Sequence, residues 1–295
     1  MYTFDFALTL FVNGLITGSV YVLVAIGLTL IFGILHVVNF AHGEFYMLGG
    51  FLGLVASTTL GLPLPFALIF AMVGVAALAI AAERLVFRPI RGREPTDTII
   101  SSFGLAVVLQ NAALLVFGPQ PQLIRTELST VFLNFGPIFL TGQRALIPVV
   151  TLVIVVIFHI VLRYTWTGRA LRAVAQHPTV ATLSGIDVNR VALATFAIGG
   201  GLAAGAGMMM STVYLVHPQV GAMTALKAFT VVIVGGMGNV YGAVAAGLLL
   251  GVTESFVSGY ISNEARDIVG FALVILVLMV QPSGLFSFGR SMDRA

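Results

Sequence analysis

The residues most able to do chemistry lie in one short polar run, residues 39–44, between two long apolar stretches. His42 and Glu44 are ionisable, and ionisable groups inside a membrane are costly, so they usually mark a function. They could line a path, form a gate or relay a proton. The structural alternative is that Asn39 caps the following helix, Gly43 allows close packing, and the polar side chains bond to loop backbone. The residues leave both interpretations open.

A second polar segment runs from Gly168 to Arg190. Its pattern predicts a helix over 169–176, with both arginines of that stretch on one side, then Pro178 and a shorter helix over 179–184 that ends at Gly185. An amphipathic pair of this kind can lie on lipid headgroups or dock into a groove on a soluble partner. The residues alone do not decide between these two roles.

A third feature is a glycine-rich interruption at 235–239, inside the apolar run 227–258. Non-helical backbone at membrane depth survives only where protein or a water-filled path covers it, and broken helices often lie at transporter sites. The plainer alternative is a short loop between two short helices. The candidates for a substrate path or gate are therefore Asn39, His42, Glu44, Gly235, Gly236, Gly238 and Asn239.

The chain that carries these segments has the composition of a membrane protein. Of its 295 residues, 59% are hydrophobic and only 8% are charged, against roughly 25% charged in a soluble domain. So few charges could not cover a soluble surface. A net charge of +3 gives no basis for nucleic-acid binding, and the absence of cysteine excludes disulfides and cysteine-based metal sites. Scattered histidines, with no HExxH, GxSxG or Walker A motif, predict no catalytic site, no metal site and no cofactor on this chain.

Apolar runs predict an all-α, polytopic helix bundle in one transmembrane domain covering 1–295. A membrane helix needs about 20 mostly apolar residues, and glycines four apart, such as Gly14 with Gly18 and Gly247 with Gly251, predict close helix packing. Eight spans are expected, at 7–35, 40–60, 64–87, 97–118, 145–163, 189–213, 227–252 and 267–281.

The distribution of arginine orients these spans, because basic residues flanking spans usually stay cytoplasmic. Arginines gather at 84–93, at 163–190 and at the C-terminal Arg290 and Arg294, whereas 254–267 is net negative and 119–144 is nearly neutral. Lys227 and Glu254 are interpreted as structural groups at span ends. The two chain ends then fall on opposite sides, which needs an odd number of crossings. One segment must be broken, re-entrant or double, and 227–258 is the best candidate.

The order and spacing of short motifs along nearly the whole chain resemble those of the LivH-type permeases. These are inner-membrane, multi-pass subunits of bacterial ABC importers for branched-chain amino acids. The matching motifs are Gly27–Gly33, Asn39–Gly49, Glu83–Leu85 with Arg88–Pro89, Ser102–Leu105, Leu109–Asn111, Gly168–Ala173, Gly185–Asp187 and Gly235–Asn239.

The resemblance implies partners and a mechanism. A second, LivM-type permease would pair with the chain, two soluble ATPases of the LivG and LivF types would bind ATP and magnesium, and a periplasmic binding protein would deliver leucine, isoleucine or valine. ATP hydrolysis would drive alternating access within the lipid bilayer. The segment 168–187 would be the coupling region that docks in the ATPase groove, through residues that include Gly168, Arg169, Arg172, Ala175, Pro178, Gly185 and Asp187.

Two alternatives to a branched-chain amino-acid importer remain at this point. One is a urea or short-amide ABC permease, which has a similar Ala-His-Gly-Glu core; the Asn-Phe-Ala-His-Gly-Glu-x-Tyr-Met version here favours amino acids. The other is a stand-alone secondary transporter or channel. Two features argue against a stand-alone transporter or channel. The sequence has no paired intramembrane carboxylates for ion coupling, and it has a coupling-type loop.

Overall fold

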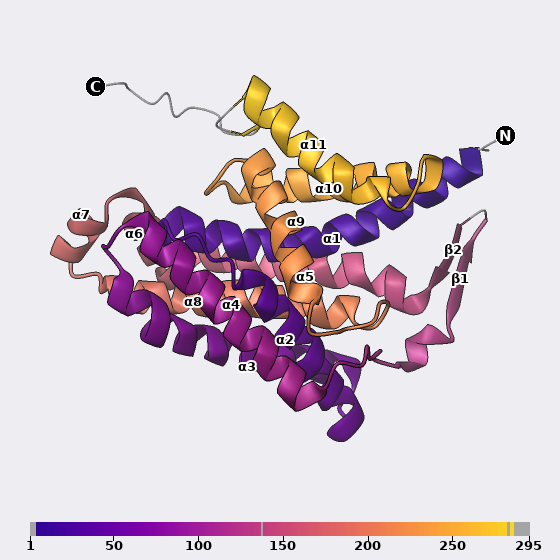
Figure 1. Cartoon of the computed structure of the whole chain (residues 1–295), viewed down its shortest axis with the longest axis horizontal. Helices are drawn as coiled ribbons and strands as arrows, with labels where there is room; N and C mark the ends of the chain where they lie inside the picture. Colours follow the sequence, from indigo (N-terminus) through magenta and orange to yellow (C-terminus); the bar gives the residue numbers. More distant parts are fainter. Residues whose placement is uncertain (1–3, 137, 282–283, 286–295) are drawn as a thin grey trace.

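The structure is a computed structural model that describes residues 4–136, 138–281 and 284–285, and helices dominate it (Figure 1). In chain order the elements are α1 (Phe4–Leu35), α2 (His42–Leu54), η1 (Val55–Thr59), α3 (Leu64–Ala82), η2 (Glu83–Phe87), η3 (Arg88–Ile90), α4 (Pro95–Phe117), η4 (Glu127–Ser129), β1 (Phe132–Phe135), β2 (Ile138–Thr141), α5 (Gly142–Tyr164), α6 (Trp166–Gln176), α7 (Pro178–Leu183), α8 (Val188–Met210), α9 (Val220–Gly235), α10 (Val240–Tyr260) and α11 (Ala265–Val280).

Six helical segments of the described chain are long and apolar enough to cross a membrane. They lie in α1, α3 with its extension to Ile90, α4, α5, α8 and α10, and they confirm the polytopic all-α fold. The predicted spans 40–60 and 267–281 correspond to α2 with η1 and to α11. The apolar run counted as one span over 227–252 is interrupted, as expected for this segment, and forms two helices, α9 and α10.

The break between α9 and α10 lies where the glycine-rich run predicted it. Gly236 and Gly238 have φ angles of 93° and 83°, which L-residues with a side chain rarely adopt, so the helix cannot continue. The sixteen residues of α9 extend about 24 Å, less than the roughly 30 Å of a bilayer core. Figure 1 shows α9 standing steeply across α1 and α10, so it is the broken segment that the parity argument required.

The centre of the bundle is formed by α1, α2 and α8, whose middle residues are buried. Two glycine pairs bring α1 and α10 together in an antiparallel seam. A methyl group added at Gly14 would lie 2.5 Å from Val252 Cα, and one added at Gly251 would lie 2.4 Å from Gly18 Cα. Because these distances leave no room for side chains, the two backbones pack directly on each other.

The bundle has two chemically different ends. Arg91 donates a hydrogen bond of 3.0 Å to Asn189 Oδ1, so the arginine-rich segments 84–93 and 163–190 meet at one end, together with α6 and α7 (Figure 1). The start of α1, the β1–β2 hairpin and the α10–α11 junction lie at the other end. This separation agrees with the charge-based orientation, and we call the two ends cytoplasmic and outer. Arg290 and Arg294 lie outside the described residues.

The outer segment 119–144 contains a feature that the sequence analysis did not predict. Strands β1 and β2 pair antiparallel, with Phe132 opposite Thr141 and Asn134 opposite Phe139. Between them Gly136 has a φ angle of 66°, which allows the chain to reverse. The hairpin leads directly into α5.

Candidate functional site

The polar run at the start of α2 is buried inside the bundle. Asn39 and His42 are fully buried, and Glu44 is 3% exposed. His42 Nε2 lies 3.1 Å from the carbonyl oxygen of Val24, in the middle of α1. Since α1 continues for eleven residues beyond Val24, to Leu35, segment 36–41 folds back along α1 by about 16 Å.

The structure shows that Asn39 does not cap α2. The N-cap position is Ala41, and no side chain makes the capping hydrogen bond. Within the described residues, both amide atoms of Asn39 and His42 Nδ1 are buried without a hydrogen-bond partner. Each such group costs roughly 1–3 kcal/mol. The capping alternative is therefore wrong, and the helix-break interpretation of this run remains.

The N-terminal turns of α2 and α9 meet at this point. A methyl group on Gly43 would lie 2.0 Å from the carbonyl oxygen of Gly221 and 2.8 Å from Ala225 Cβ, so the prediction that Gly43 allows close packing is confirmed. A methyl group on Gly221 would lie 2.5 Å from Glu44 Oε2. The carboxylate thus lies against the first turn of α9, where the helix dipole favours negative charge.

A cavity of about 750 Å³ lies at the cytoplasmic end, between α1, α5, α6 and the α9–α10 loop. Four of the predicted site residues meet in its wall: Gly238 and Asn239 from the helix break, and Arg172 and Ala175 from the predicted coupling region. Asn39, His42, Glu44, Gly235 and Gly236 are not part of this wall. The structure therefore divides the predicted path residues between the α2–α9 junction and this cavity.

The helix break itself is a tight loop with a cap. Asn239 Oδ1 accepts a hydrogen bond of 3.1 Å from the amide of Gly242, which caps α10. Gly235 is buried against Gly242, since a methyl group on Gly235 would lie 2.6 Å from the Gly242 carbonyl carbon. A methyl group on Gly33 of α1 would lie 2.9 Å from Gly238 Cα. The plainer interpretation, a short loop between two helices, describes this geometry, and one edge of the loop faces the cavity.

The cavity also has polar groups that the sequence analysis missed. His159 and Tyr241 face each other across its rim, with Tyr241 Oη 3.4 Å from His159 Nδ1. Thr29, in the C-terminal part of α1, lines the wall, and its buried hydroxyl has no partner within the described chain. Nothing in the local sequence marks these residues, because each stands alone in an apolar helix.

The predicted coupling region forms the expected pair of helices, α6 and α7. Thr165 Oγ1 accepts a hydrogen bond of 3.2 Å from the amide of Gly168, and Gly168 is needed because a methyl group there would lie 2.0 Å from the carbonyl oxygen of Leu162. Arg172 donates to that same carbonyl oxygen. The first turn of α6 is therefore fastened to the last turn of α5.

The end of the pair is shaped by three predicted residues. Pro178 occupies the first position of α7, where its fixed φ angle suits a helix start. Gly185 follows α7 with a φ angle of 80°. Asp187 caps α8 by accepting a hydrogen bond of 2.9 Å from the amide of Asn189.

Helices α6 and α7 present an exposed surface at the cytoplasmic end. The inner face of α6 is buried through Leu171 and Val174, while Arg169 and Arg172 are exposed. On α7 the apolar side chains Val180 and Leu183 are 58% and 84% exposed. Exposed apolar side chains that gather on one surface mark contacts with another protein or with the membrane.

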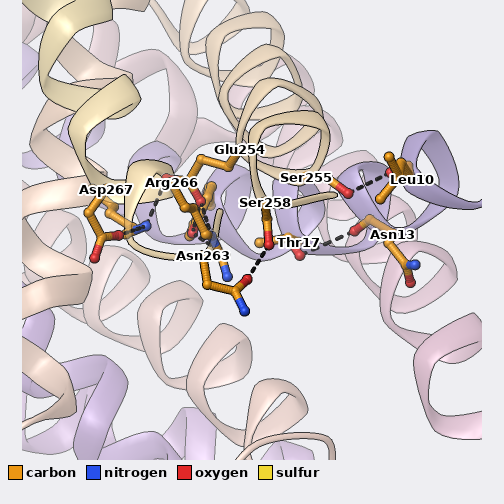
Figure 2. A network of polar contacts seen from close by, with 11 residues as sticks. Leu10, Asn13, Thr17, Glu254, Ser255, Ser258, Asn263, Arg266 and Asp267 are labelled. Carbon is orange, nitrogen blue, oxygen red and sulfur yellow. Dashed lines mark hydrogen bonds and ion pairs between the residues drawn. The ribbon is translucent and has the colours of Figure 1, made fainter. Parts of the chain in front are cut away.

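A buried charge network at the outer end joins α1, α9, α10 and α11 (Figure 2). Glu254 is 1% exposed and accepts hydrogen bonds from Tyr21 Oη at 2.7 Å, Lys227 Nζ at 2.7 Å and Arg266 Nε at 2.8 Å. Lys227 also pairs with Asp267 at 2.9 Å. Lys227 and Glu254 are structural groups, as expected, but they lie within α9 and α10 rather than at span ends, and they bind each other inside the bundle.

The described residues contain no group of three or more potential metal ligands. The polar side chains described above belong instead to a helix junction, an open cavity, an exposed helix pair and a charge network.

Comparison with known proteins gives a consistent result. A family model described as the permease component of branched-chain amino acid transport systems matches residues 10–278. The chain is 37% identical to the LivH permease protein of the high-affinity branched-chain amino acid transport system of Salmonella typhimurium, over 92% of this chain and 93% of the relative. It is 36% identical to the corresponding BraD protein of Pseudomonas aeruginosa, over 93% and 94%.

One solved structure shares the fold. PsaBC from Streptococcus pneumoniae, in complex with Fab, superposes with a TM-score of 0.50 over 92% of this chain and 91% of that chain, at 14% identity. The helical spans and the curated relatives together show a multi-pass inner-membrane protein. The chain belongs to the family of permease components of branched-chain amino acid transport systems.

Proposed function

We propose that this chain is the permease subunit of an ATP-driven importer that carries leucine, isoleucine or valine from the periplasm into the cytoplasm. The observation that carries the proposal is the identity of 36–37% to LivH and BraD, which extends over at least 92% of the chain. The importer would contain a second, homologous permease, two ATPases that bind ATP and magnesium, and a periplasmic amino-acid-binding protein.

The exposed pair α6–α7 would dock in the ATPases. Its surface combines the arginines of α6 with the exposed apolar side chains Val180 and Leu183. Leu183 stands at the end of a six-residue helix at the tip of the segment, so it projects as a single apolar point. Such a projecting side chain favours insertion into a protein groove over contact with lipid headgroups. The residues that shape the pair, among them Gly168, Pro178, Gly185 and Asp187, would hold it in position.

The same pair would transmit movement to the solute path. Leu171, Arg172 and Ala175 of α6 form part of the wall of the cytoplasmic cavity, so a displacement of α6 changes the shape of that cavity directly. In this proposal the cavity is the cytoplasmic exit, and Gly238 and Asn239 form its opposite edge.

The junction between α2 and α9 would act as the gate. It combines unpartnered buried polar atoms on Asn39 and His42 with the carboxylate of Glu44 against the start of α9. Two helices that begin inside the bundle can shift without breaking a continuous span. Replacement of Asn39 or His42 by Ala should therefore lower coupled uptake more than it lowers the amount of assembled protein.

The docking role is tested by Leu183→Asp in the complete transporter, purified in mild detergent. Loss of an apolar anchor and gain of a charge should reduce ATPase copurification at least about tenfold. Leu123→Asp is the matched control, because Leu123 is also exposed, at 40%, but lies in the outer segment. Equal ATPase recovery with both variants would contradict docking through α7. Recovery of the wild-type chain without ATPases or a second permease would contradict the importer itself.

A further inference from the structure

A second cavity, of about 270 Å³, lies at the outer end between α1, α5, α8 and α10. It is smaller than the roughly 300–1,000 Å³ of pockets for drug-sized ligands, so its size suits one small molecule. It lies on the same three helices as the cytoplasmic cavity, since α1, α5 and α10 contribute to both. Between the two cavities the α1–α10 seam is closed, because a methyl group on Gly18 would lie 2.9 Å from Leu248 Cα.

Arg144 is an uncompensated cation in the wall of this outer cavity. Its guanidinium lies 3.5 Å from Asn13 Oδ1 and 6.0 Å from the centre of the Tyr214 ring. No carboxylate of the described residues lies within 4 Å of it, in contrast to Arg266 of the same wall, which binds Glu254 and Tyr21. A partly buried guanidinium without an anion is unfavourable, and its planar fork fits a carboxylate.

The hydroxyl groups of the cavity can accept a hydrogen bond from an ammonium group. Ser255 donates its proton to the carbonyl oxygen of Leu10, and Ser258 donates to Asn263 Oδ1 (Figure 2). A hydroxyl oxygen that has donated its proton still has lone pairs to accept with. The cavity therefore offers a cation to the carboxylate of a zwitterion and neutral hydrogen-bond acceptors to its ammonium group.

Apart from the hydroxyl group of Thr17, most of the remaining wall of the cavity is apolar. Leu10, Ile16, Ile147, Met210 and Val213 surround the polar groups. Aliphatic side chains bind an aliphatic group by removing its surface from water, at about 25 cal/mol per Å². A charged side chain placed there would lose its hydration without compensation.

We propose that this outer cavity binds the free branched-chain amino acid, with Arg144 binding the α-carboxylate in a bidentate pair. Asn13 and Tyr214 position the guanidinium, the hydroxyl oxygens of Ser255 and Ser258 face the ammonium group, and the apolar wall holds the side chain. The inference rests on the proposed function, because it names where this chain would first hold the substrate.

The test measures binding of radiolabelled leucine to the assembled transporter in nucleotide-free nanodiscs. Arg144→Gln should raise the Kd for leucine about 10- to 100-fold, the range lost with a charge-assisted pair. Arg125→Gln removes the same charge from an exposed site in the same outer segment and should leave the Kd unchanged. Leucinol, which lacks the carboxylate, should compete poorly in the wild-type protein, and Arg144→Gln should abolish this discrimination.

A second variant covers the case in which Arg144→Gln does not assemble. Asn13→Asp places a carboxylate beside Arg144, so it should supply the missing anion and weaken leucine binding in an intact protein. Unchanged leucine affinity in Arg144→Gln or Asn13→Asp would overturn the assignment of Arg144. A wild-type transporter that neither binds nor transports leucine would instead overturn the proposed substrate class, and with it this inference.

Discussion

Replacement of Glu254 by Gln removes the central anion of the outer charge network, which joins α1, α9, α10 and α11. Glu254 accepts three hydrogen bonds, all between 2.7 and 2.8 Å, and two of them come from cations. The variant keeps the size of the side chain but leaves Lys227 and Arg266 without that compensation. The change is therefore electrostatic rather than a loss of packing.

The expected loss of stability follows from the burial of Glu254 and its partners. Removing one partner of a buried ion pair costs about 3–5 kcal/mol. The lower end applies here, because Lys227 and Arg266 have side chains that are 19% and 31% exposed and Lys227 keeps Asp267. A loss of about 3 kcal/mol changes the ratio of folded to unfolded protein about 150-fold. It corresponds to a decrease in the unfolding temperature of about 6 °C for a chain of this size.

The assay is thermal unfolding in one detergent, followed by size-exclusion fluorescence at increasing temperature. Glu264→Gln is the matched control, because Glu264 is exposed in the adjacent loop and should change stability by less than about 0.5 kcal/mol. Arg266→Met added to Glu254→Gln should recover part of the loss, since among the described residues Arg266 has no other carboxylate within 4 Å. Equal unfolding temperatures for Glu254→Gln and Glu264→Gln, or no recovery in the double variant, would refute the reasoning.

Two further predictions concern backbone approach and capping. Gly43→Ala should lower the yield of folded protein several-fold, since its methyl group would lie 2.0 Å from the Gly221 carbonyl oxygen. Gly104→Ala is the control and should fold normally, because Gly104 has open space around it. The measurement is the yield of folded protein extracted in detergent, and equal yields for the two variants would contradict the close packing at Gly43. Asn239→Ala should destabilise α10 by about 1 kcal/mol through loss of the hydrogen bond to Gly242, measured by thermal unfolding; no change would contradict the cap.

Features encoded by neighbouring residues were predictable. The helix pair α6–α7 follows from Pro178 and Gly185, which start and stop a helix locally, and the α9–α10 break follows from Gly236 and Gly238, whose φ angles are positive. Hydropathy averages over this break and counts 227–252 as one run, whereas the glycines mark the interruption that α9 and α10 confirm.

Features that depend on distant contacts were not predictable. Glu254 is paired with Tyr21, which is 233 residues away, so no local pattern distinguishes it from a surface carboxylate at a span end. The residues alone could not decide between the capping and helix-break alternatives for Asn39 for the same reason, because its burial results from segment 36–41 folding back along α1. Arg144 stands alone in the sequence, and only the cavity around it makes it a candidate binding residue.

The most direct test of the central proposal is uptake of leucine into proteoliposomes that contain this chain, its second permease and the two ATPases. Uptake is measured with the binding protein outside and ATP either inside or absent. The proposal predicts accumulation of leucine above its external concentration only when ATP and magnesium are inside and the binding protein is present. Leucine uptake that proceeds at the same rate without ATP would show a passive or secondary carrier and contradict the account.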